Sequence, residues 1–234
     1  MNDFRSVDKI CRRIAYDQGR VYDLDMLRQA LTLTWLKQRL ADLFSTESVV
    51  VVIGDGFGTF SSLTLGAFPN TRVIAVNLVK TLLVDVVYAL KALPNVGVTL
   101  VTNADGMHEA LDDPSTRLIA DRASDCELLT ETRAKLAVNI ASMQEMNSST
   151  IAEYFRILRS IPGPLAFYCC NREAKVLPDG TIIRFEDYPW SADDIIADDE
   201  LCPWNQDYYS IRPPFIFPLD GPVRHRLVTL AHRQ

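Results

Sequence analysis

The sequence predicts an α/β fold with a doubly wound, mostly parallel sheet. Five consecutive β-branched residues at 49–53 predict a strand buried on both faces, which is typical of parallel sheets. Helical patterns alternate with further apolar runs, at 72–76, 98–101, 117–120, 136–140 and 165–169. Because parallel strands need crossover connections, this alternation favours a parallel sheet with ligand sites at the carboxyl ends of its strands.

The helices are expected where apolar residues recur at helical spacing. Residues 5–44 predict a helical preface with no visible chemistry, in which Asp23 or Asp25 caps the second helix. Later helices are expected over 59–68, after the second strand, and over 149–159. The chain therefore divides into an N-terminal helical segment, 1–45, and an α/β domain, 46–234, whose irregular end, 171–234, could cover a substrate site.

The composition limits the partners. The 234 residues are 48% hydrophobic, and the net charge of -6 disfavours nucleic acid or an anionic membrane as a partner. No apolar run is long enough to span a bilayer, and the N-terminus lacks the apolar core of a signal peptide. The five cysteines form no C-x-x-C pair and are typical of reduced thiols. We expect a cytoplasmic protein, and a homo-oligomer stays open.

A glycine loop directly follows the first strand. Gly54, Gly56 and Gly58 let the backbone turn sharply and approach a ligand, and the amides that begin the next helix would face the same ligand. Asp55 lies in this loop and contacts either a cofactor or solvent. A dinucleotide loop has the spacing G-x-G-x-x-G, but here the third glycine comes one residue early. The spacing is that of Rossmann-like methyltransferases, so we expect S-adenosylmethionine, with NAD(P) or a turn without ligand as alternatives.

The second strand ends where an acidic residue normally binds the ribose hydroxyls of a nucleotide. Here the residue is Asn77, whose amide oxygen accepts a hydrogen bond but lacks a carboxylate's charge, so Asn77→Asp is expected to tighten cofactor binding. The adenine is expected over Leu78, with Asp121 reaching its exocyclic amine. If 98–101 is the true third strand, Asp105 takes that role instead.

Beyond the loop, the sequence resembles the family assigned as sugar O-methyltransferases. The run at 77–83, Asn-Leu-Val-Lys-Thr-Leu-Leu, resembles that family's D-L-P-E-T-L-L segment, although Asn77 replaces its Asp and Val79–Lys80 replace its Pro–Glu. Three further segments follow in the family's order: Ala-Ser-Met-Gln-Glu-Met at 141–146, which resembles the family's S-F-Q-E-M, then F-Y…N-R at 167–172 and an aromatic patch at 187–190. The resemblance covers about 48–234 and implies a class I S-adenosylmethionine-dependent methyltransferase acting on a sugar hydroxyl.

Methyl transfer to a hydroxyl requires alignment of the reactants and a group that removes the proton. Glu145, a few residues past the strand at 136–140, is the expected catalytic base, and its alternative role is to cap backbone amides. Ser142 and Gln144 are expected to orient the cofactor and the sugar. Asn171 and Arg172 are expected to bind the acceptor, unless they form a surface turn. His225 is a minor alternative base.

Three functions stay open: a sugar O-methyltransferase, an NAD(P)-dependent oxidoreductase, and a catalytically degenerate methyltransferase fold that serves as a binding or scaffold protein. The acidic run at 193–200 is expected to be a solvated loop, and no metal site is predicted. The predicted site consists of Glu145 for catalysis, Gly54, Asp55, Gly56, Gly58, Asn77, Leu78, Asp121 and Ser142 for the cofactor, and Gln144, Asn171 and Arg172 for the substrate.

Overall fold

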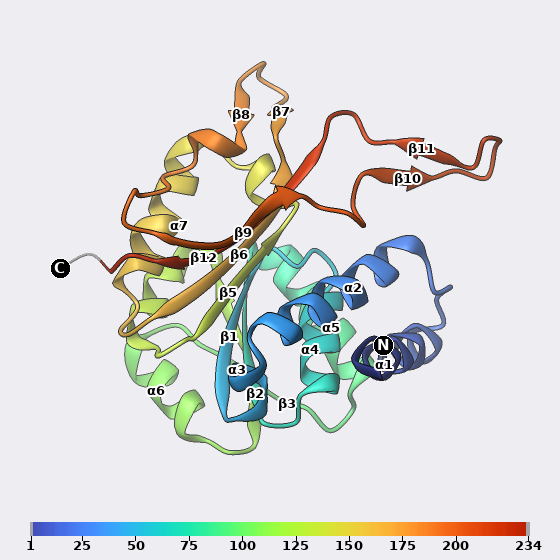
Figure 1. The fold of residues 1–234 in the computed structure, drawn as a ribbon. Helices are drawn as coiled ribbons and strands as arrows, with labels where there is room; N and C mark the ends of the chain where they lie inside the picture. The colour runs from blue at the N-terminus through green and yellow to red at the C-terminus, as the bar shows by residue number, and fades with distance from the viewer. Residues whose placement is uncertain (1, 233–234) are drawn as a thin grey trace.

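One eight-stranded sheet organises the computed structural model, which describes residues 2–232 (Figure 1). Its strands are β1 (Ser48–Ile53), β2 (Thr71–Asn77), β3 (Gly97–Leu100), β4 (Thr116–Arg122), β5 (Leu136–Ile140), β6 (Leu165–Arg172), β9 (Ile195–Leu201) and β12 (Val223–Leu230). They lie in the order β3-β4-β2-β1-β5-β6-β12-β9. The pairs from β3 to β6 are parallel, whereas β12 is antiparallel to both β6 and β9. The predicted doubly wound, mostly parallel sheet is therefore confirmed.

Helices cover both faces of this sheet (Figure 1). The α-helices are α1 (Asn2–Gln18), α2 (Leu24–Arg39), α3 (Ala41–Ser45), α4 (Thr59–Ala67), α5 (Val79–Ala92), α6 (Ala104–Asp112) and α7 (Ser148–Ser160), and the 3-10 helices are η1 (Ala123–Glu131), η2 (Met143–Glu145) and η3 (Phe185–Asp187). Val50 and Val52 pack into the core beneath α1, α2, α4 and α5, while Val51 packs into the core on the α6–α7 face. Successive side chains of a strand point to opposite faces, so β1 is buried on both.

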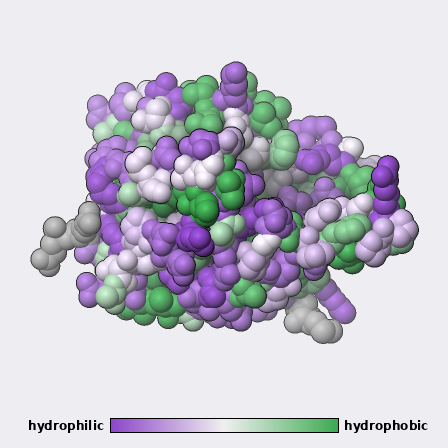
Figure 2. Space-filling view, turned by 90° about the horizontal axis from the view of Figure 1, so that it is seen from above, coloured by the Kyte–Doolittle hydropathy of each residue, from purple (hydrophilic) through white to green (hydrophobic). Residues whose placement is uncertain are grey.

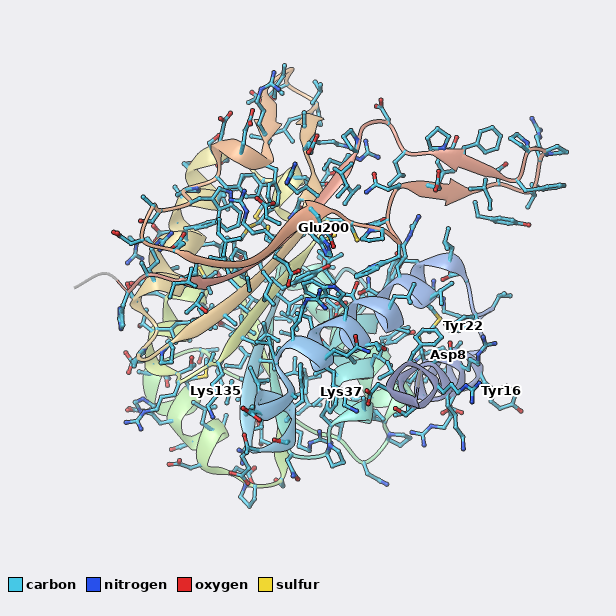
Figure 3. The ribbon with its side chains drawn as sticks, in the orientation of Figure 1. Asp8, Tyr16, Tyr22, Lys37, Lys135 and Glu200 are labelled. Atoms are coloured by element: carbon cyan, nitrogen blue, oxygen red, sulfur yellow. The ribbon has the colours of Figure 1, made fainter. Side chains whose placement is uncertain are left out.

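The N-terminal helices pack against the sheet domain through α4 and α5. Asp23 caps α2 by accepting a hydrogen bond from the Met26 amide at 2.9 Å, which settles the choice between Asp23 and Asp25. Tyr22 donates to Asp8 at 2.5 Å, and Figure 3 shows the two side chains where α1 and α2 meet. These contacts fix the connection between α1 and α2.

The segment after Asn171 is more regular than the sequence predicts, since β9 and β12 complete the main sheet. Arg224 and Arg226 of β12 both pair with Asp199 of β9, and a strand carrying such charges lacks the apolar run that predicts a buried strand. Asp198, Asp199 and Glu200 of the acidic run therefore lie in a paired strand, and Asp194 pairs with Arg159, so the expectation of a solvated loop is wrong.

Two small hairpins project from this part of the chain. The first consists of β7 (Ala174–Val176) and β8 (Ile182–Arg184), and the second, an arm, of β10 (Asp207–Tyr209) and β11 (Ile216–Pro218). Figure 1 shows the arm extending away from the sheet on the side of α2, and Figure 2 shows apolar and polar residues mixed along it. No helix within residues 2–232 is long and apolar enough to cross a membrane.

Candidate functional site

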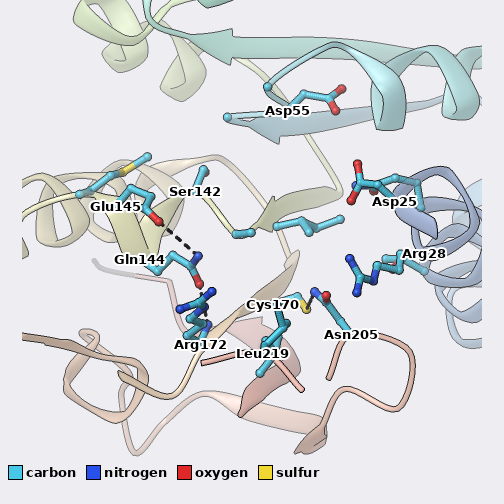
Figure 4. Close-up of a pocket in the computed structure, with 18 of the residues that line it drawn as sticks. Asp25, Arg28, Asp55, Ser142, Gln144, Glu145, Cys170, Arg172, Asn205 and Leu219 are labelled. Carbon is cyan, nitrogen blue, oxygen red and sulfur yellow. Dashed lines mark hydrogen bonds between the residues drawn. The ribbon is translucent and has the colours of Figure 1, made fainter. Parts of the chain in front are cut away.

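A cavity of about 580 Å³ lies at the carboxyl ends of the central strands (Figure 4). The glycine loop after β1, the end of β2, the turn from β5 into η2, and the end of β6 form one side of it. The other side comes from α2 and from residues next to the arm, namely Trp204, Asn205, Leu219 and Val223. The strand ends supply most of the expected site, but α2 was not expected to contribute.

The glycine loop turns as predicted, because Gly54, Gly56 and Gly58 all have positive φ, between 70° and 81°. A Cβ on Gly54 would lie 2.3 Å from the Ser142 hydroxyl oxygen, and one on Gly58 would lie 2.7 Å from the Asp85 carbonyl oxygen. Gly54 is therefore needed for contact with the η2 turn, and Gly58 for contact between α4 and α5. Gly54 and Gly56 line the cavity, whereas Gly58 does not.

Asp55 caps the helix that follows the loop, and it also lines the cavity. Its carboxylate accepts hydrogen bonds from the amides of Phe60 at 3.0 Å and Ser61 at 2.7 Å. Burial raises the pKa of Asp55, although these hydrogen bonds oppose the shift. The expectation that the first amides of this helix face a ligand is wrong for these two groups, because Asp55 occupies them. Asp55 is likewise not a solvated residue.

Asn77 ends β2 beside the cavity, where the sequence places a ribose-binding residue. Its amide nitrogen donates to the Asp85 carboxylate at 2.8 Å, and its amide oxygen accepts from the Leu78 amide at 2.9 Å. Asp85 is 1% exposed, and burial raises the pKa of its carboxyl to about 7. Asp85 therefore fixes the orientation of the Asn77 amide. Its carboxylate contacts Asn77 directly but does not itself line the cavity.

The residues predicted for the adenine separate in the structure. Leu78 is 70% exposed and lines the cavity, but Asp121 is 0% exposed and does not line it. Burial raises the pKa of Asp121 to about 7, and neither carboxyl oxygen has a hydrogen-bond partner within residues 2–232. Asp105 lies on α6, which follows the outermost strand β3 and not the neighbour of β2. Neither aspartate lines the cavity beside Leu78, so the assignment of the adenine amine to Asp121 or Asp105 stays a prediction.

Asn171 is a buried structural residue, so its prediction as a substrate ligand is wrong. It is 0% exposed, donates to the Asn139 side-chain oxygen at 2.9 Å and accepts from the Gln144 amide at 3.1 Å. Ser142 lines the cavity, but its hydroxyl donates to the Ile53 carbonyl at 3.0 Å and accepts from Asn139. These contacts join the ends of β1, β5 and β6 behind the cavity wall.

Glu145, Gln144 and Arg172 come together on the wall opposite α2 (Figure 4). The Gln144 side-chain oxygen accepts from the Arg172 amide at 2.7 Å, and its nitrogen donates to Glu145 at 3.4 Å. The side chain of Glu145 is 51% exposed, and its carboxylate lies 3.3 Å from the Lys175 ammonium. The Glu145 carboxylate is thus accessible to a substrate, and no hydrogen bond to a backbone amide within residues 2–232 supports the capping alternative.

Four polar residues of α2 line the opposite wall, and the sequence analysis missed them. Asp25, Arg28, Gln29 and Thr32 recur at helical spacing, so they share one face of α2. Arg28 donates to the carbonyl oxygens of Trp204, at 3.2 Å, and Asp207. The sequence signal that could have identified them is this row of polar residues along a helix whose other residues pack into the core.

His225 is not a cavity residue. It is buried in β12, where its Nδ1 lies 3.1 Å from the Tyr168 hydroxyl and its ring contacts Trp35 and Trp204. Burial lowers its pKa, although Glu200 opposes the shift, and His225 does not line the cavity, so the minor assignment as a catalytic base is wrong. The cysteines in the described residues are all free thiols, and no group of three or more His, Cys, Asp or Glu residues there could hold a metal ion.

Comparison with known proteins bears on the fold. No family model matches the sequence, and a search of curated proteins finds no match, so the resemblance noted above rests on its motifs alone. Among solved structures, the chain is similar to yhhF from Escherichia coli, which is classed provisionally as a methyltransferase. The identity is 10%, the alignment covers 88% of this chain and 87% of that chain, and the TM-score is 0.50.

Two other solved structures are similar to this chain at comparable identity. The mitomycin 7-O-methyltransferase MmcR has 13% identity and a TM-score of 0.48, over 88% of this chain and 57% of that chain. An RNA methyltransferase candidate from Pyrococcus horikoshii has 12% identity and a TM-score of 0.49, over 88% and 84% of the two chains. This chain spans little more than half the length of MmcR. At 10% identity the likeness to yhhF shows the fold alone, a Rossmann-like α/β fold.

Proposed function

We propose that this protein transfers a methyl group from S-adenosylmethionine to a hydroxyl of a small molecule, with a sugar or sugar derivative as the acceptor. The observation that carries the proposal is the shared cavity. The glycine loop, Asn77 and Leu78 line it, and so does Glu145, whose side chain is about half exposed. A nucleotide cofactor at the strand ends of such a sheet would lie between these groups.

The cavity residues fit this cofactor. Gly54 and Gly56 expose backbone that has no Cβ facing the cavity, and the Asn77 amide oxygen, held by Asp85, can accept a second hydrogen bond from a ribose hydroxyl. Leu78 offers an apolar surface to the adenine. The side-chain oxygen of Gln29 is buried at the cavity wall with no hydrogen-bond partner within residues 2–232, which suits a ligand donor. When bound, S-adenosylmethionine supplies an electrophilic methyl group.

The remaining lining suits a polar acceptor. Arg172 and Asn205 offer hydrogen-bond donors, and Trp204 offers an aromatic ring, which can contact the apolar face of a sugar. We assign Glu145 as the group that takes the proton from the acceptor hydroxyl. Its ion pair with Lys175 holds the carboxylate beside the cavity, and Gln144 anchors the η2 turn that carries it.

A methyl-transfer assay tests this function. The protein is incubated with methyl-deuterated S-adenosylmethionine and with pools of free sugars, sugar phosphates and nucleotide sugars, and the products are analysed by mass spectrometry. We expect one sugar-containing product that carries a single labelled methyl group and disappears when the protein is heat-inactivated. Labelled product only in pools of non-sugar alcohols would overturn the sugar assignment. No labelled product from any pool would contradict methyl transfer itself.

A further inference from the structure

Helix α2 presents a group of unusual composition to the cavity. Asp25, Arg28 and Gln29 lie at positions i, i+3 and i+4, so their side chains project from one face of the helix. All three line the cavity together with Gly54 and Asp55 of the glycine loop, and Figure 4 shows Asp25 and Arg28 pointing into it from the same side. One end of the cavity therefore holds a carboxylate, a guanidinium and an amide on a single rigid element.

Each member of this group has unused capacity. Within the part of the chain that the structure describes, neither Asp25 nor Arg28 forms a side-chain ion pair, and the Gln29 oxygen is buried without a donor. Arg28 uses two N–H groups on the carbonyl oxygens of Trp204 and Asp207, which fixes the guanidinium but leaves its charge uncompensated. A guanidinium has five N–H donors, so others stay available.

The surroundings of Asp25 disfavour an unpaired negative charge on its carboxyl group. Its side chain is open to the cavity, yet the surrounding protein raises the pKa of its carboxyl by displacing water, and Asp23 adds to the shift. Arg28 and Arg20 oppose that shift through their positive charges. A ligand cation beside Asp25 would replace the lost hydration of its charge.

A ligand that complements these three side chains carries a positively charged group and a negatively charged group close together, as an amino acid does on its α-carbon. We propose that Asp25, Arg28 and Gln29 bind the amino-acid end of S-adenosylmethionine, with Arg28 on its carboxylate and with Asp25 and Gln29 on its ammonium group. This assignment rests on the proposed function. It places the adenosine at Asn77 and Leu78 and the amino-acid end against α2, with the glycine loop between them.

Two ligands separate this subsite from the rest of the cofactor site. S-adenosylhomocysteine carries the amino-acid end, whereas 5′-methylthioadenosine has the same adenosine and sulfur without it. Both are titrated by calorimetry into the wild-type protein and into Arg28→Gln and Asp25→Asn. Arg13→Gln, an exposed change on α1, serves as the matched control. The Asp25 variant keeps the contacts of Arg28 with the arm, so it tests the subsite if Arg28→Gln disturbs folding.

We expect each α2 variant to weaken S-adenosylhomocysteine binding at least tenfold, while 5′-methylthioadenosine binding changes less than twofold. The control variant should bind both ligands as the wild-type protein does. Equal losses for both ligands, or no loss for either, would overturn the subsite while leaving the proposed function intact. A wild-type protein that binds neither ligand would contradict the proposed function and the subsite together.

Discussion

The replacement of an acidic residue by Asn77 has a structural counterpart in Asp85. The carboxylate that the end of β2 lacks is present on α5, within hydrogen-bond distance of the Asn77 amide. Asp85 lies behind the wall and does not line the cavity, so it orients Asn77 without being a ligand itself. The amide oxygen of Asn77 accepts from the Leu78 amide and can accept a second hydrogen bond.

This contact reverses the expected effect of Asn77→Asp. The substitution would place two carboxyl groups at the 2.8 Å contact and remove the donor that stabilises the Asp85 charge. We expect it to weaken S-adenosylhomocysteine binding about tenfold, or about 1.4 kcal/mol, measured by calorimetry. The double variant Asn77→Asp/Asp85→Asn should recover that loss, because it exchanges the carboxylate and the amide. Tighter binding by Asn77→Asp alone would show that Asp85 does not control this position.

Glu145→Gln tests the assignment of the base. The amide keeps the size of the side chain but cannot accept the acceptor's proton, so kcat should fall by about a hundredfold or more. Binding of S-adenosylhomocysteine should stay unchanged, because Glu145 lies on the side of the cavity opposite Asp25 and Arg28 (Figure 4). Glu153→Gln, a change at an exposed carboxylate on α7, provides the control for the loss of one charge. Full activity of Glu145→Gln would remove Glu145 from this role.

At the scale of elements, the glycine loop and the η2 turn are fitted to each other. Gly54 has φ of 71°, and a Cβ there would lie 2.3 Å from the Ser142 hydroxyl oxygen. Gly56 has a similar φ of 81°, but a Cβ there would meet no atom within 4 Å. The two positions thus separate the effect of the backbone conformation from the effect of close packing.

We expect Gly54→Ala to destabilise the protein more than Gly56→Ala does. The alanine at position 56 should cost about 1 kcal/mol of unfolding free energy for the left-handed conformation alone. At position 54 the clash should add about 1–3 kcal/mol, measured by urea denaturation. Adding Ser142→Ala to Gly54→Ala should recover part of the loss, since it removes the nearest atom. Equal costs at the two positions would contradict the close packing of loop and turn.

Sequence patterns predicted the elements whose signals are local. The β-branched run of β1 and the apolar run of β5 gave correct strands, and the glycine spacing gave the correct loop. Strand β12 was missed because its arginines alternate with buried residues and are compensated by β9, a pairing that only the fold creates. The apolar residues of α5 do not by themselves define its buried face, since Asp85 and Tyr88 face inward while Leu83 is exposed.

The candidate site was predicted only in part, because some of its residues follow from local sequence patterns and others depend on tertiary packing. The loop glycines, Asn77 and Glu145 lie at strand ends, a location that strand order implies. The contribution of α2 could not be predicted, because it depends on how a distant helix packs over the sheet. Asn171 could not be separated from its neighbour Arg172 by position alone. Because successive side chains of a strand point in opposite directions, Asn171 bonds to the buried Asn139, whereas the next residue, Arg172, lines the cavity.

At the scale of the whole molecule, Asp121 makes stability depend on pH. The pKa of Asp121 is raised to about 7 in the folded protein, against about 3.9 for an unfolded aspartate. The unfolded state therefore releases its proton first, and stability falls as the pH rises from 4 to 7 and then levels off. The full penalty is about 4 kcal/mol above pH 7.

Asp121→Asn should relieve this penalty. We expect its gain in unfolding free energy over wild type to be larger at pH 8 than at pH 5 by about 2–3 kcal/mol, measured by urea denaturation at both pH values. Asp105→Asn, at an exposed position, should show no such difference between the two pH values. A gain that is equal at pH 5 and pH 8 would show that Asp121 is ionised normally in the folded protein.

The claim that the cavity holds S-adenosylmethionine is central to the account, and calorimetric titration with S-adenosylhomocysteine and with NADH tests it most directly. The spacing of the glycine loop and the cavity beside Asn77 and α2 predict saturable one-site binding of S-adenosylhomocysteine and no heat with NADH. Binding of NADH, or the absence of any heat or thermal stabilisation with millimolar S-adenosylhomocysteine, would contradict it.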